Sequence, residues 1–127
     1  MEIHKLEMKK GMTLKLKGKI NNNANQFFIN LGCGPKDLAL HFNPRFGEKA
    51  IVCNSQNGGN WEKEHRDSHM CFQQGMEIKL IVTFDDEEFQ VKLPDDHEVK
   101  FPNRSKCSNL SYLSVSDGIQ LISFKLE

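Results

Sequence analysis

Apolar and polar residues alternate along almost the whole chain. In segment 76–84 every second residue is apolar, and segments 14–20, 27–31, 38–42 and 89–93 repeat the pattern before an apolar run at 119–126. This period of two is typical of half-buried strands. Turn-forming residues separate the runs at 21–23, 32–35, 57–60, 94–96 and 117–118. Many short strands without a helical stripe predict an antiparallel sandwich or barrel, and 127 residues without repeat or linker predict one domain, 1–127.

The charge balance argues against two classes of partner. Lys plus Arg and Asp plus Glu both number 17, so the formal net charge is zero. Nucleic acids and anionic membranes are bound by a clustered excess of Lys and Arg, whereas the lysines at 15, 17 and 19 alternate with apolar residues, as on a solvated strand face. No segment is apolar enough to span a bilayer, and residues 1–5 lack the apolar core of a signal peptide. We therefore expect no nucleic-acid partner, no membrane insertion and a cytoplasmic location.

The cysteines are widely and unevenly spaced, at positions 33, 53, 71 and 107. In a cytoplasmic protein such a set is expected to consist of reduced thiols. No Cys-x-x-Cys pair is present, so a zinc site is not expected. The sequence predicts no metal ion and no other cofactor.

The strand expected at 38–45 carries an unusual polar face. His41, Asn43 and Arg45 alternate with apolar residues and therefore project from the same side. An ordinary solvated face remains the alternative, but such faces are rich in Lys, Glu and Thr. Three planar hydrogen-bonding side chains in a row favour a recognition surface.

A second group of candidate residues follows on the next segments. Asn54 lies on the strand expected at 51–54, and Trp61, the only tryptophan, follows a Gly-Gly turn, with Glu64 and Arg66 after it. A lone tryptophan often belongs to the core, but the polar surroundings favour an exposed indole here. An aromatic plane beside amides, Arg and Glu is suited to a sugar, because the ring packs on C–H groups while polar groups take hydroxyls.

Four segments together resemble the signature of the galectin family: 41–46 (HFNPRF), 51–55 (IVCNS), 61–66 (W-x-x-E-x-R) and 101–104 (FPNR). They occur in the family's order and spacing, and the resemblance runs over essentially the whole chain. The short connection 47–50 and the segment 110–126 resemble the prototype group, which has a single carbohydrate-recognition domain. The resemblance implies an all-β jelly-roll sandwich of two antiparallel sheets, of galectin or concanavalin-like type, without substantial helix. It also implies metal-independent binding of β-galactosides such as lactose, N-acetyllactosamine and galactose-terminated glycans.

The resemblance assigns the axial 4-hydroxyl of galactose to His41, Asn43 and Arg45. In glucose this hydroxyl is equatorial, so the same groups would be left unpaired at a cost of roughly 1–3 kcal/mol each. Sites built around a hydroxyl discriminate well for this reason.

The other roles also follow from the resemblance. Asn54 and Glu64 would take the 6-hydroxyl, and Trp61 would stack under the galactose ring. Arg45, Glu64 and Arg66 would reach the 3-hydroxyl of a second sugar. The two guanidiniums would fix the oxygens of Glu64 as acceptors.

Two positions depart from the family pattern. His65 stands where Gln or Glu is usual, and strand alternation turns it away from Glu64 and Arg66. Glu62 stands where Gly is usual, beside Trp61. These departures, with the short connection at 47–50, affect fine specificity rather than galactoside binding.

Three other functions are alternatives to sugar binding. A glycoside hydrolase needs two carboxylates across the scissile bond, and the motif strands supply only Glu64, beside arginines. An intracellular lipid carrier would have a short helical lid after its first strand, where this chain has asparagines at 21–23. A galectin-like interaction protein with weak or altered sugar binding remains the main alternative, although all motif positions are present.

Assembly is a further expectation from the resemblance. Prototype galectins form noncovalent homodimers through edge strands near both termini, here the segments 3–6 and 120–125. A single shallow groove is expected to bind weakly, so cross-linking of cell-surface glycoproteins or glycolipids would depend on multivalency. Action outside the cell would require release by a non-classical route.

Overall fold

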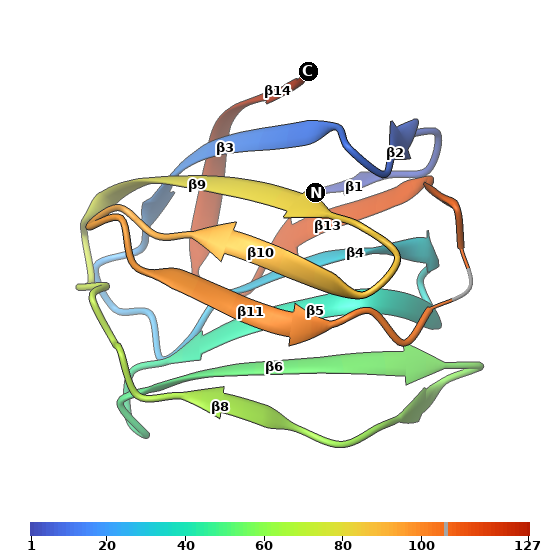
Figure 1. Cartoon of the computed structure of the whole chain (residues 1–127). Helices are drawn as coiled ribbons and strands as arrows, with labels where there is room; N and C mark the ends of the chain where they lie inside the picture. The colour runs from blue at the N-terminus through green and yellow to red at the C-terminus, as the bar shows by residue number, and fades with distance from the viewer. Residues whose placement is uncertain (106) are drawn as a thin grey trace.

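The computed structural model describes residues 1–105 and 107–127, which form two antiparallel β-sheets packed as a sandwich (Figure 1). The seven-stranded sheet consists of β1 (Glu2–Ile3), β13 (Tyr112–Ser116), β4 (Phe28–Gly34), β5 (Asp37–Arg45), β6 (Ala50–Asn57), β7 (Asn60–Trp61) and β8 (His65–Asp67), with β7 and β8 both paired to β6. The five-stranded sheet has the order β11 (Glu98–Pro102), β10 (Glu88–Lys92), β9 (Glu77–Phe84), β3 (Thr13–Ile20) and β14 (Ile119–Leu126). A short pair joins β2 (Met8–Lys9) to β12 (Asn109–Leu110).

The core lies between the two sheets and follows from the alternation in the sequence. On β3 and β9 buried and more exposed residues alternate, so one face of each strand points inward. The largest fully buried side chains include four phenylalanines, Phe27, Phe42, Phe89 and Phe101. Burying each of them contributes roughly 1.5–3 kcal/mol. The prediction of an all-β jelly-roll sandwich is confirmed.

The reversal between β4 and β5 differs from the prediction. A turn was expected at 32–35, but β4 continues to Gly34 and the chain reverses at 35–36. Register shifts flank Gly32, and a Cβ atom there would lie 2.2 Å from the carbonyl oxygen of Asp37. Gly32 therefore allows two backbone segments to approach closely inside the hairpin, and it is not part of the turn itself.

In the described part of the chain, no helix is long and apolar enough to cross a membrane.

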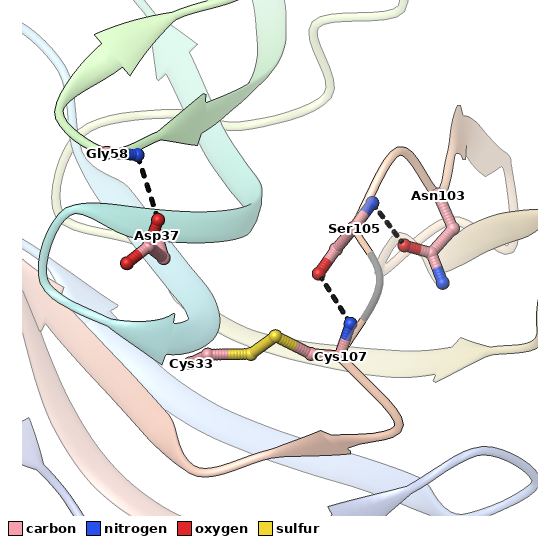
Figure 2. Close-up of a disulfide and its surroundings, with 6 residues drawn as sticks. All are labelled: Cys33, Asp37, Gly58, Asn103, Ser105 and Cys107. Carbon is pink, nitrogen blue, oxygen red and sulfur yellow. Dashed lines mark hydrogen bonds between the residues drawn. A yellow bond between two sulfur atoms is a disulfide. The ribbon is translucent and has the colours of Figure 1, made fainter.

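The cysteines also differ from the expectation of four reduced thiols. Cys33, at the end of β4, and Cys107, in the loop after β11, form a disulfide with a Cα–Cα distance of 6.5 Å (Figure 2). The two residues are 74 positions apart, so only the tertiary structure shows that they meet. Cys53 is buried and Cys71 is half-buried, and burial raises the pKa of these thiols to about 12 and about 11.

Candidate functional site

A groove of about 450 Å³ lies on the face of the seven-stranded sheet that points away from the core. Strand β5 forms its floor because His41, Asn43 and Arg45 alternate with buried apolar residues. The groove is lined by Gln26, Phe28, His41, Asn43, Arg45, Val52, Asn54, Trp61, Glu62 and Glu64. The structure thus brings together every predicted site residue except Arg66, which lies beside the lining in ion pairs with Glu64, a lining residue, and with Glu48.

His41 occupies the centre of this floor as a neutral imidazole. Its Nδ1 lies 2.6 Å from the Oδ1 atom of Asn30 on the neighbouring strand β4. Burial lowers the pKa of His41 to about 4, and the charge of Arg45 acts in the same direction, whereas contact with Asn43 and the charge of Glu64 oppose the shift. A neutral ring has one donor nitrogen and one acceptor nitrogen. At physiological pH His41 can therefore accept a hydrogen bond from a hydroxyl group.

Asn43 is oriented by the backbone, and Arg45 is oriented by Asn43. The Nδ2 atom of Asn43 donates to the carbonyl oxygen of Phe27 over 2.8 Å and to Oε1 of Gln26 over 3.3 Å. Its Oδ1 atom accepts a 2.8 Å hydrogen bond from Nε of Arg45. The amide is therefore fixed, and it turns the guanidinium of Arg45 along the groove.

Two carboxylates join the arginines at one end of the groove. Glu64 lies 3.5 Å from Arg45 and 3.2 Å from Arg66, and Glu48 lies 3.0 Å and 2.7 Å from the same residues. Hydrogen bonds from Arg66 and then Arg45 lower the pKa of Glu48. Glu48 was not predicted from the sequence. The sequence feature that could have indicated it is its position three residues after Arg45, in the short connection at 47–50, where it can form an ion pair with that residue.

Asn54 on β6 is held by the backbone and by a second loop. Its Nδ2 atom donates to the carbonyl oxygen of Glu62 over 3.1 Å, and its Oδ1 atom accepts from the backbone N–H of Ser55 over 2.8 Å. Arg104 donates from Nη1 to Oγ of Ser55 over 3.1 Å and lies at 3.5 Å from Oδ1 of Asn54. The guanidinium of Arg104 also lies over the ring of Phe101, 4.8 Å from its centroid. The motif at 101–104 was noted in the sequence, but this role of Arg104 and the backbone role of Glu62 were not.

Trp61 lies beside His41, with the centroids of the two rings 4.7 Å apart. It is 52% exposed. The preceding turn is held against the β4–β5 hairpin. The backbone N–H of Gly58 donates to Oδ1 of Asp37 over 2.8 Å, as Figure 2 shows, and Gly59 donates to the carbonyl oxygen of Lys36 over 2.9 Å. The prediction of an exposed indole is confirmed.

The disulfide lies in the same region as these turns. It connects β4 next to the hairpin with the loop that carries Arg104 (Figure 2). In that loop Oδ1 of Asn103 accepts from Ser105, and Oγ of Ser105 accepts from the backbone N–H of Cys107. The disulfide therefore limits how far the loop can move from Ser55.

The groove combines an exposed aromatic plane with fixed hydrogen-bonding groups of both polarities. Within residues 1–105 and 107–127 no group of three or more His, Cys, Asp or Glu side chains is arranged to hold a metal ion. The site is open and polar, unlike the enclosed apolar cavity that a lipid requires. The fold and the groove together are those of a β-sandwich suited to binding a sugar.

Comparison with known proteins gives the same result. The family model for galactoside-binding lectins matches residues 1–126. Galectin-2 of Mus musculus is 54% identical over 126 residues, covering 99% of this chain and 96% of that protein, and galectin-2 of Homo sapiens is 53% identical over 127 residues, covering 100% and 96%. The chain belongs to the galactoside-binding lectin family, the galectins.

Solved structures agree over the whole fold. The crystal structure of chicken galectin 2 superposes with a TM-score of 0.97 at 52% identity, covering 99% of this chain and 97% of that chain. The structure of CG-16, a homodimeric agglutinin from chicken liver, has a TM-score of 0.95 at 35% identity, covering 100% and 98%. The resemblance to prototype galectins is confirmed, and galectin-2 proteins are among the relatives that this chain matches. As a galectin the chain is a lectin and not an enzyme.

Proposed function

We propose that this chain binds β-galactosides such as lactose, N-acetyllactosamine and galactose-terminated glycans without a metal ion. The proposed ligands of the sugar are His41, Asn43, Arg45, Asn54, Trp61, Glu64 and Arg66, all within a single domain at 1–127. The observation that carries the proposal is the half-exposed indole of Trp61 beside His41, at the end of the polar row on β5. An aromatic plane next to such a row suits a pyranose with an apolar face and an axial hydroxyl.

The fixed orientations in the groove support this assignment. Asn43 is held by the carbonyl oxygen of Phe27, and Asn54 by that of Glu62, so neither amide has to be ordered when a sugar binds. Arg45 can only donate hydrogen bonds, whereas neutral His41 can accept one. Together they can satisfy both the oxygen and the proton of one hydroxyl.

Calorimetric titration with lactose tests the proposal. Cellobiose serves as the glucose-ended control, and EDTA is present throughout. We expect saturable heat from lactose alone, abolished in Trp61→Ala and retained in the matched control His65→Ala, because His65 packs beside Phe101 outside the groove lining. Absence of lactose heat at millimolar sugar from folded protein would contradict the proposal. It would favour the alternative of a galectin-like interaction protein with weak or altered sugar binding.

The finer proposal is a noncovalent homodimer formed through the terminal strands. β1 is the edge of the seven-stranded sheet and β14 is the edge of the five-stranded sheet (Figure 1). Unpaired edges of this kind can pair with a second copy. On β14, Ile122 lies at a register shift and is 50% exposed, and Phe124 is 38% exposed. The relative CG-16 is a homodimeric agglutinin.

Light scattering at micromolar concentration tests the assembly. A dimeric mass is expected for the native chain and a monomeric mass for Ile122→Asp, with Lys63→Asp as an exposed control away from β14. A monomeric mass for the native chain would contradict the dimer.

Cross-linking of cell-surface glycoproteins or glycolipids belongs to the same proposal, since two grooves in one dimer would be needed. Cytoplasmic location with release by a non-classical route is proposed on the family resemblance. Fractionation of producing cells and their medium, with and without a block of vesicular secretion, tests this part.

A further inference from the structure

A row of polar residues crosses the seven-stranded sheet and continues beyond the groove. His41 on β5 lies opposite Asn30 on β4, and Asn30 lies opposite Ser114 on β13. Residues directly opposite in antiparallel strands have Cβ atoms about 4.5–5.5 Å apart, so their side chains can interact. Asn30 and Ser114 are only 8% and 6% exposed, and neither lines the groove.

Hydrogen bonds link these side chains in series. Nδ2 of Asn30 donates to Oγ of Ser114 over 2.9 Å, and Oδ1 of Asn30 lies 2.6 Å from Nδ1 of His41. A buried amide is costly to leave unpaired, so it is expected to keep both partners. With its N–H directed at Ser114, Asn30 presents only a carbonyl oxygen to His41.

This arrangement determines which nitrogen of His41 carries the proton. A carbonyl oxygen cannot donate, so Nδ1 of the neutral ring must bear the hydrogen that Asn30 accepts. The other nitrogen, Nε2, is then left with a free lone pair. If the proton were on Nε2, this nitrogen would be a hydrogen-bond donor, as Arg45 already is. A sugar hydroxyl bound between His41 and Arg45 would then have no acceptor for its own proton.

We infer that Asn30 and Ser114 are positioning residues that fix the Nδ1–H form of His41 and so make its Nε2 atom a hydrogen-bond acceptor for the axial hydroxyl of galactose. The inference deepens the proposed function and rests on it for the role of His41. Neither residue touches the sugar in this arrangement. Their effect on specificity is transmitted through the imidazole.

Nitrogen-15 NMR of the histidine rings measures this property directly and without any sugar, because protonated and bare ring nitrogens resonate far apart. The native chain at pH 7.5 is expected to show His41 with the proton on Nδ1, assigned with His41→Gln. In Ser114→Ala and Asn30→Ala the ring is expected to become a mixture of both forms. Lactose affinity should fall by roughly 3- to 10-fold in Asn30→Ala, the effect of one lost hydrogen bond.

Asn30→Asp provides the conservative rescue. A carboxylate still accepts from Nδ1, so the ring should keep its native form and bind lactose at pH 7.5. The added negative charge favours the imidazolium form of His41, as the charge of Glu64 does, whereas the charge of Arg45 opposes this form. Binding should therefore be lost at a higher pH than in the native chain. Ser116→Ala, two residues from Ser114 on the same strand, is the matched control and should change neither the NMR signal nor the affinity.

The outcomes separate this inference from the proposed function. Proton on Nε2 in the native chain, or an unchanged ring in both Asn30→Ala and Ser114→Ala, would overturn the inference even if lactose binds. The expected ring form without lactose binding would support the hydrogen-bonded row and reject the proposed sugar site instead.

Discussion

Arg45 and Arg66, 21 residues apart in the sequence, share the same two carboxylates. Each guanidinium contacts one oxygen of Glu48 and one oxygen of Glu64, so positive and negative groups alternate in a closed ring. All four side chains are partly exposed, and solvent weakens each single pair. The ring is therefore better suited to orienting Arg45 along the groove than to stabilising the fold.

The first prediction concerns Glu48→Gln. Removing this charge should loosen both arginines and weaken lactose binding by roughly 3- to 10-fold, while the free energy of unfolding changes by less than about 1 kcal/mol. Calorimetry and urea unfolding measure the two quantities. Glu87→Gln, an exposed acid in the turn before β10, is the control. Unchanged affinity in Glu48→Gln would show that Glu48 is not needed to orient the arginines.

The second prediction separates stacking from hydrogen bonding at Trp61. Because about half of this side chain is exposed, Trp61→Phe should leave stability nearly unchanged while retaining a smaller aromatic plane. Lactose affinity is expected to fall in the order Trp61, Trp61→Phe, Trp61→Ala when all three proteins are titrated. Equal affinity of the Phe and Ala variants would argue against stacking.

The third prediction is a pH dependence of binding. The pKa of His41 is lowered to about 4, chiefly by burial and then by Arg45, and that of Glu48 is lowered by its arginines. Both groups thus keep their charge states from pH 8 down to pH 5. Lactose affinity should be flat over this range and fall as the pH approaches 4, when His41 becomes a cation. A midpoint near 6.5 would contradict this account.

The fourth prediction applies the same shift to stability. Between pH 6.5 and 4 the unfolded chain binds a proton at His41 and the folded chain does not, so the free energy of unfolding decreases as the pH falls through this window. A shift of this size corresponds to roughly 3 kcal/mol. Urea unfolding at pH 7.5 and 4.5 should show a smaller difference for His41→Gln than for the native chain. His4→Gln, at an exposed position, should behave like the native chain.

The fifth prediction concerns the disulfide between Cys33 and Cys107. It closes a long loop, so reduction should lower the free energy of unfolding by about 4 kcal/mol if the constraint acts on the unfolded chain. Urea unfolding with and without dithiothreitol measures this difference. The double variant Cys33→Ser/Cys107→Ser should no longer respond to the reductant. A response that persists in the double variant would show that the reductant does not act through this disulfide.

The alternation of side chains along single strands determined much of this protein. It was sufficient to predict the all-β class, because half-buried strands must place apolar residues at every second position. It also placed His41, Asn43 and Arg45 on one face, since that relation depends only on the strand geometry of one segment. The turn at 57–60 was likewise visible from its glycines.

Contacts between distant segments were decided only by the tertiary structure. Asn30 meets His41 and Ser114 because three strands lie in one register, which no local pattern specifies. Cys33 and Cys107 form their disulfide for the same reason, against the expectation of free thiols. Strand pairing over many residues is set by the packing of both sheets around the shared core, and that packing depends on the whole chain at once.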